Sequence, residues 1–185
     1  SLNIGNKTSA IVTILDDNGK KVLADKDNGM VVPRGSVAVI DMIGPVIKYG
    51  DFCTYGADEI VNALRLADAN PNIIGSVLNV DGPGGAVSAI GPFMDFGAKK
   101  KKPVVGLADQ ACSLHYWALC AATDYKMTDN NVSAQFGSVG VVSSFADNRK
   151  YLENLGYVFH EIYPKESEHK NEAFRLAMDG KYDMI

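Results

Sequence analysis

The feature that most constrains the fold is a regular alternation of apolar strand-length segments with helical segments in the middle of the chain. The strands are expected at residues 36–43, 73–80 and 102–108, and the helices at residues 58–69, 86–99 and 113–122. Mostly apolar strands are typical of parallel sheets that are covered on both faces. Because strand–helix–strand connections are right-handed, the sequence predicts an α/β domain with a largely parallel sheet.

The flanking segments predict a small β element before this alternation and a mixed region after it. Residues 10–24 are expected to form a hairpin, because turn residues at 16–19 separate two short apolar runs. We therefore divide the chain into an N-terminal hairpin extension, residues 1–32, and one larger domain, residues 33–185. The later elements are expected as strands at residues 125–128, 139–143 and 157–162 and helices at residues 146–155 and 172–178.

Charge and hydropathy argue against two classes of partner. The chain has 185 residues and a formal net charge of -4 without an extended basic patch, whereas a nucleic-acid surface needs clustered Lys and Arg. The one cationic run, residues 99–102, fits a solvated helix end. No apolar run approaches the roughly 18 to 20 residues that span a bilayer, so we expect no membrane span.

The cysteines predict neither a disulfide framework nor a metal site. Cys53, Cys112 and Cys120 are odd in number and lack metal-ligand spacing. A reducing compartment is the simpler interpretation, which favours a cytoplasmic location.

Ser113 lies where an apolar strand gives way to an apolar helix. A hydroxyl at the first turn of a buried helix is close to unpaired N–H groups and to the positive end of the helix dipole, which favours a nucleophile. A serine at a helix start is more commonly an N-cap, and this stretch alone favours capping.

A glycine-rich turn, residues 81–85, follows the second buried strand. Such a turn permits close approach of backbone to a ligand. A phosphate cradle lacks the expected glycine spacing, whereas an oxyanion loop needs only a well-aimed N–H. Loops at the carboxyl ends of parallel strands converge, so Gly84 and Gly85 are expected to face Ser113.

The sequence alone does not select a general base. His115 lies about 200° around the helix from Ser113, so its ring points away from the hydroxyl. His160 is expected in a strand and His169 in a surface loop. A lysine can act as the general base if it is neutral. Two candidates, Lys165 and Lys170, follow the last expected strand.

Several segments, in order, resemble the S49 peptidases, the family of signal peptide peptidase A and of phage head-maturation proteases. That family shares the ClpP and crotonase fold. The matching segments are residues 81–85 (DGPGG, similar to DSPGG), 111–117 (ACSLHYW, similar to AASGGYW), 137–141 (GSVGV, similar to GSIGV), the pair Leu155 and Gly156, and 168–170 (EHK, similar to the segment around the general-base lysine).

This resemblance implies a ClpP/crotonase-like fold and a serine endopeptidase with a Ser-Lys dyad. Ser113 would be the nucleophile and Lys170, rather than Lys165, the general base. Backbone N–H groups of Gly84 or Gly85 and of Leu114 would hold the oxyanion. The resemblance further implies a protein or peptide substrate, no cofactor and no metal, and a homo-oligomer with sites at subunit interfaces.

The chain departs from the family pattern beside the nucleophile. Gly82 replaces a serine, and Leu114 and His115 replace two glycines. The surroundings of Lys170 and the lack of an N-terminal anchor favour a phage or prophage branch in a bacterial host. The alternatives are a catalytically silent assembly protein of this fold, a signal-peptide-degrading peptidase, and an acyl-CoA hydratase or isomerase of the crotonase branch.

Overall fold

The computed structural model describes residues 8–23, 31–51 and 54–185. The chain divides into two compact units, Ser1–Val141 and Val142–Ile185. Cys53 lies outside the described residues. The predicted division at residues 32 and 33 stays a prediction.

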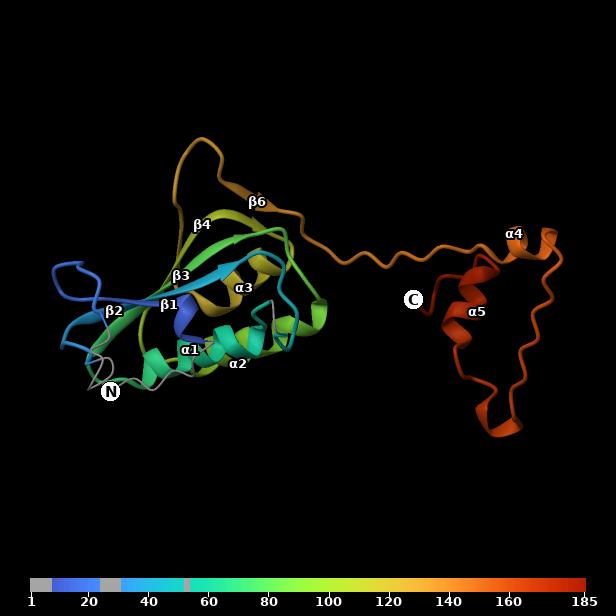
Figure 1. Ribbon diagram of the computed structural model, residues 1–185, viewed down its shortest axis with the longest axis horizontal. Helices are drawn as coiled ribbons and strands as arrows, with labels where there is room; N and C mark the ends of the chain where they lie inside the picture. Colours follow the sequence, from blue (N-terminus) through green and yellow to red (C-terminus); the bar gives the residue numbers. More distant parts are fainter. Residues whose placement is uncertain (1–7, 24–30, 52–53) are drawn as a thin grey trace. The chain divides into compact units, whose positions relative to one another are not determined.

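The first unit is built on a six-stranded sheet, which confirms the α/β class (Figure 1). The first strand pairs antiparallel with the second, and the other pairings between the named strands are parallel. The strands lie in the order β1 (Val12–Leu15), β2 (Ser36–Ile43), β3 (Ile73–Gly82), β4 (Val104–Cys112) and β5 (Tyr125–Thr128), and β6 (Gln135–Gly137) pairs with the end of β4.

Three α-helices pack together along one side of this sheet (Figure 1). They are α1 (Ala57–Ala69), α2 (Ile90–Lys99) and α3 (Leu114–Ala122), and 3-10 turns lie at Thr8–Ile11 and Val87–Ala89. Helix α1 packs on β2 and β3, α3 packs on β3 and β4, and α2 packs between α1 and α3. Apolar side chains of both layers, such as Ile40, Leu78 and Phe93, are fully buried between them.

The strands are buried on one face more than on the other. In β2 the side chains of Ala38, Ile40 and Met42 are fully buried, whereas the alternate residues Val39 and Asp41 are only half-buried. The prediction of strands covered on both faces was therefore wrong for this strand within the described residues. The run is apolar on its second face because of its valines, and strand propensity alone produces such a run.

The second unit consists of two short helices joined by extended chain. Helix α4 (Arg149–Asn154) is shorter than predicted, and α5 (Glu172–Met178) begins and ends as predicted. A 3-10 turn, Lys165–Ser167, lies between them. Phe145 and Phe174 meet edge to face with their ring centroids 6.1 Å apart, and most other side chains are exposed.

Two predicted strands are absent from the described structure. Residues 139–143 and 157–162 are extended but join no ladder, and β6 forms just before the first of them. Val142 is 87% exposed and Ile162 is 91% exposed. A β-branched run becomes a strand only when a neighbouring strand supplies hydrogen bonds and a second layer covers its side chains, and sequence propensity contains neither fact.

Candidate active site

Ser113 occupies a strained turn between β4 and α3. Its φ of 54° and ψ of -118° place a residue with a side chain in a region that favours glycine. Such a conformation costs about 1–3 kcal/mol and persists where the surroundings impose it. Here the Ser113 N–H donates to the Gly137 carbonyl at 2.8 Å, and the Ser113 carbonyl accepts from the Trp117 N–H at 3.0 Å. In α/β-hydrolase enzymes, a sharp strand-to-helix turn of this kind presents the nucleophile.

The interpretation of Ser113 as a helix cap was wrong. The residue stands at the N-cap position of α3, but its side chain makes no capping hydrogen bond. An N-cap residue normally has extended backbone angles, whereas Ser113 has a positive φ. The hydroxyl is therefore not used to hold the start of the helix.

The glycine-rich turn after β3 lies directly against Ser113, as the convergence of parallel strands predicted. A Cβ atom at Gly84 would lie 2.7 Å from the Ser113 Cβ and 3.2 Å from its Oγ. The φ of Gly84 is 125°, which side chains also disfavour. Only glycine at this position allows the turn to approach the hydroxyl so closely.

Two backbone N–H groups beside Ser113 have no acceptor among the described residues. The Val46 N–H donates to Gly84 at 3.1 Å and the Ala86 N–H donates to Val46 at 2.9 Å, which leaves the Gly85 N–H outside this bridge. Leu114 is the first residue of α3, where N–H groups lack an acceptor within the helix. These two N–H groups are the donors predicted for an oxyanion hole.

An apolar cavity of about 390 Å³ opens beside these groups. Gly85, Ser113 and Leu114 line it together, and Leu114 is 3% exposed. The remaining lining is mostly apolar and comes from Val87, Tyr116, Trp117, Cys120, Val139, Gly140 and Val141. The cavity can therefore take an apolar group next to the serine.

His115 lies beneath the glycine-rich turn and does not line this cavity. Its side chain is fully buried, and neither ring nitrogen makes a hydrogen bond in the structure. Its Nε2 atom is 2.3 Å from the position that a Cβ at Gly82 would take. Burial lowers the pKa of His115 to about 4, and the nearby Gly44 carbonyl opposes this shift, so the ring is neutral at pH 7.

Gly82 and His115 are therefore one structural feature. Compared with the S49 pattern that the sequence resembles, position 82 has a glycine in place of a serine, and position 115 has a histidine in place of a glycine. The ring of His115 fills the space that Gly82 leaves. The opposite size changes were visible in the sequence, but only the structure shows that the two residues are in contact.

The predicted lysines belong to the second unit. Lys170 is exposed in a turn after the 3-10 segment, where its N–H donates to the Ser167 carbonyl at 3.0 Å. Lys165 is also exposed. Ser113 and Lys170 thus lie in different units, and their pairing stays a prediction.

The two other histidines are also in the second unit. The Nδ1 atom of His169 is 2.8 Å from the Glu172 carboxylate, and both side chains lie at the surface. His160 is exposed in an extended segment that forms no strand, which corrects the strand prediction for this residue. Neither histidine is brought to Ser113 by the contacts of the described structure.

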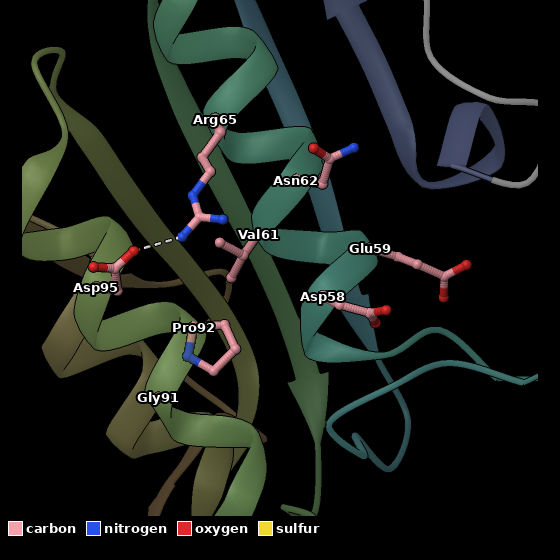
Figure 2. A pocket seen from close by; sticks show the side chains of 8 residues that line it. All are labelled: Asp58, Glu59, Val61, Asn62, Arg65, Gly91, Pro92 and Asp95. Atoms are coloured by element: carbon pink, nitrogen blue, oxygen red, sulfur yellow. Dashed lines mark hydrogen bonds and ion pairs between the residues drawn. The ribbon is translucent and has the colours of Figure 1, made fainter.

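A larger cavity of about 530 Å³ lies between α1 and α2, and its charged side chains make hydrogen bonds or ion pairs within the fold (Figure 2). Arg65 donates to the Asp95 carboxylate at 2.7 Å, while Asp58 and Glu59 point away from this pair. Lys99, with Arg65, lowers the pKa of Asp95. Asp58 and Glu59 accept hydrogen bonds from backbone N–H groups at the start of α1.

The described part of the chain contains no group of three or more His, Cys, Asp or Glu residues that could hold a metal ion. Cys112 and Cys120 are free thiols. None of the described helices is long and apolar enough to cross a membrane.

Comparison with known proteins finds a phage relative. The chain matches no protein-family model. The head-tail preconnector protein GP5 of Enterobacteria phage P21 is 28% identical over 165 residues. The match covers 85% of this chain and 31% of GP5, so the chain spans about a third of that relative's length.

The strained turn predicts an unusual response of stability to substitution at Ser113. Because the Ser113 side chain makes no capping hydrogen bond, we expect the free energy of unfolding of Ser113→Ala to lie within about 0.5 kcal/mol of the wild-type value. Ser113→Gly should be more stable by on the order of 1 kcal/mol, because glycine adopts this φ without strain. Urea denaturation measures both. A loss of about 1–2 kcal/mol in Ser113→Ala, with no gain in Ser113→Gly, would show instead that Ser113 is a cap.

Buried His115 predicts a loss of stability in mild acid. Its pKa is lower in the folded protein than the ordinary value of 6.5, so the unfolded chain binds the proton first as pH falls. The contribution of neutral His115 to the free energy of unfolding is complete above pH 6.5. As the pH falls towards 4, the free energy of unfolding drops by up to about 3 kcal/mol. The His115→Leu variant should not lose this stability as the pH falls. The control variant His160→Leu, which changes an exposed histidine, should lose it as wild type does. Equal pH slopes of the unfolding free energy in wild type and His115→Leu would contradict the assignment.

Proposed function

We propose that the chain carries the catalytic site of an S49-type serine endopeptidase that acts in phage head maturation, with Ser113 as its nucleophile. The observation that carries the proposal is the approach of Gly84 to the Ser113 hydroxyl at a strained turn. Free N–H groups of Gly85 and Leu114 beside one apolar cavity support it further. Similarity to a phage preconnector protein supports the phage context in a bacterial host cytoplasm.

In this proposal the Ser113 Oγ attacks the scissile carbonyl carbon, and the carbonyl oxygen becomes an oxyanion. The Gly85 and Leu114 N–H groups donate to that oxyanion. The Lys170 amine accepts the serine proton and returns it to the leaving amine as the C–N bond breaks. Water then attacks the acyl-enzyme carbonyl and gives a proton to Lys170. Lys170 passes this proton to the Ser113 Oγ as the ester bond breaks, which releases the product acid and restores the hydroxyl. Loss of one oxyanion donor typically costs about 10² to 10³ in rate.

The apolar cavity supplies a place for a substrate side chain next to the scissile bond. Its walls come from the first turns of α3 and from residues 139–141. Leu114 narrows this space with its side chain while its backbone N–H remains available. We infer that the substrate is an extended or unfolded protein segment with an apolar residue at this position.

The position of Lys170 on a separate unit leaves two arrangements, each consistent with the chain's topology. Lys170 serves the Ser113 of its own chain, or it serves the Ser113 of a neighbouring copy in a homo-oligomer. We include assembly into a homo-oligomer in the proposal.

A catalytically silent assembly protein is the second candidate. It is favoured by the bulky Leu114 and the buried His115, which replace two glycines of the resembled pattern beside the serine. The two candidates differ in one measurable property, because only the peptidase requires the Ser113 hydroxyl and the Lys170 amine.

Hydrolysis of an unfolded protein tests the proposal directly. Wild type should cleave it, and Ser113→Ala and Lys170→Ala should each lose at least about 10³-fold in kcat/KM. Lys165→Ala, a matched loss of an exposed lysine, should retain activity. Cleavage by Ser113→Ala at the wild-type rate would refute the proposal, and loss of activity in Lys165→Ala alone would move the base to that residue.

Co-expression of the two inactive variants separates the two arrangements. If Lys170 acts on a neighbouring chain, up to about a quarter of the sites in a mixed oligomer contain both functional groups, and activity partly returns. If Lys170 acts within its own chain, no site regains both groups and activity stays absent.

A further inference from the structure

His115 fills a position that determines where the glycine-rich turn can lie. The ring occupies the volume that a side chain at Gly82 would need, with its Nε2 2.3 Å and its Cε1 2.7 Å from the absent Cβ. The Gly44 carbonyl oxygen lies 2.8 Å from the same point. The ring thus lies between α3, whose first residue follows Ser113, and the Asp81–Gly85 turn.

The outer edge of the turn is held by a separate set of hydrogen bonds. The Gly44 N–H donates to the Asp81 carbonyl at 2.8 Å, and the Val46 N–H donates to the Gly84 carbonyl at 3.1 Å. The Ala86 N–H donates back to Val46 at 2.9 Å. These bonds fix the outer edge of the turn to the segment after β2, and the pairing of Gly82 with Ala111 fixes its start against β4. On the side that faces α3, the ring of His115 lies against Gly82.

An imidazole is a costly choice for a residue that only fills space. A buried polar group without a hydrogen bond destabilises a protein by about 1–3 kcal/mol, and an apolar side chain of similar size avoids this cost. Neither ring nitrogen of His115 makes a hydrogen bond of good geometry, although the Gly44 carbonyl is close enough to oppose the lowering of the pKa. Unsatisfied buried groups in native proteins call for an explanation, and function is a common one.

We propose that His115 is a positioning residue of the oxyanion hole, whose neutral ring, seated against Gly82 and Gly44, sets the distance between the Asp81–Gly85 turn and Ser113. The inference rests on the proposed peptidase function for its catalytic consequence. His115 does not touch the substrate, because it is absent from the cavity lining and fully buried. Its effect reaches the reaction through the Gly85 N–H.

The proposal predicts a change in rate without a matching change in binding. His115→Ala should lower kcat by about 10- to 100-fold, because a displacement of about 1 Å in a catalytic group has effects of this size. KM should change less than about twofold, because the cavity keeps its lining. Gly82→Ala should lower kcat similarly, because its Cβ collides with the ring. His160→Ala, which removes an exposed histidine, should match wild type.

A double variant tests whether the two positions share one space. Gly82→Ala with His115→Ala should recover part of the lost kcat, because the new methyl group enters the space the ring has left. Recovery is expected to be partial, since the Gly44 carbonyl also lies close to that methyl. Additive losses in the double variant would overturn the proposal.

Hydrogen exchange provides a readout that does not depend on activity. Amide exchange in a peptide covering residues 81–90 should be faster in His115→Ala than in wild type. In the double variant, exchange should be slower than in His115→Ala. Unchanged exchange and unchanged kcat in folded His115→Ala would overturn the proposal. If wild type itself cleaves nothing, the peptidase proposal fails, and the exchange rates still decide whether His115 positions the turn.

Discussion

The contact between Gly84 and Ser113 is the constraint on which the candidate site depends. It requires a glycine at position 84, because any Cβ there would collide with the serine. It also requires Ser113 to adopt a positive φ. Both conditions are unfavourable in isolation. They are met because β3 and β4 are parallel neighbours whose ends deliver the two turns to one edge of the sheet. The arrangement has the form expected of a nucleophile beside an oxyanion loop, and that function is our proposal.

The fold supports this contact from several directions. Strand β6 pairs with the end of β4 and accepts the Ser113 N–H through Gly137, while α3 engages the Ser113 carbonyl. The segment after β2 holds the glycine-rich turn through Val46. His115 fills the space between the turn and α3. Rigid elements therefore determine the position of each group, which is the condition for preorganised stabilisation of a developing charge.

The predictable part of the structure was local or topological. Periodicity placed β2 and α5 at their observed bounds, and the convergence of parallel strands predicted that Gly84 would face Ser113. The conformation of Ser113 could not be predicted, because a cap and a nucleophile occupy the same place in a sequence. Contact between His115 and Gly82 was also hidden, since it joins residues distant in the chain. The strands expected at residues 139–143 and 157–162 were wrong because strand formation depends on a partner that propensity does not encode.

The central claim is that this turn makes Ser113 a nucleophile, and covalent labelling with a fluorophosphonate measures that property most directly. The protein contains many serines, so the modified residue should be located by mass spectrometry of the digested adduct. The account predicts one phosphonyl group per chain, on Ser113, and none in Ser113→Ala. An unlabelled Ser113 in folded, assembled protein, or labelling spread over exposed serines, would contradict it.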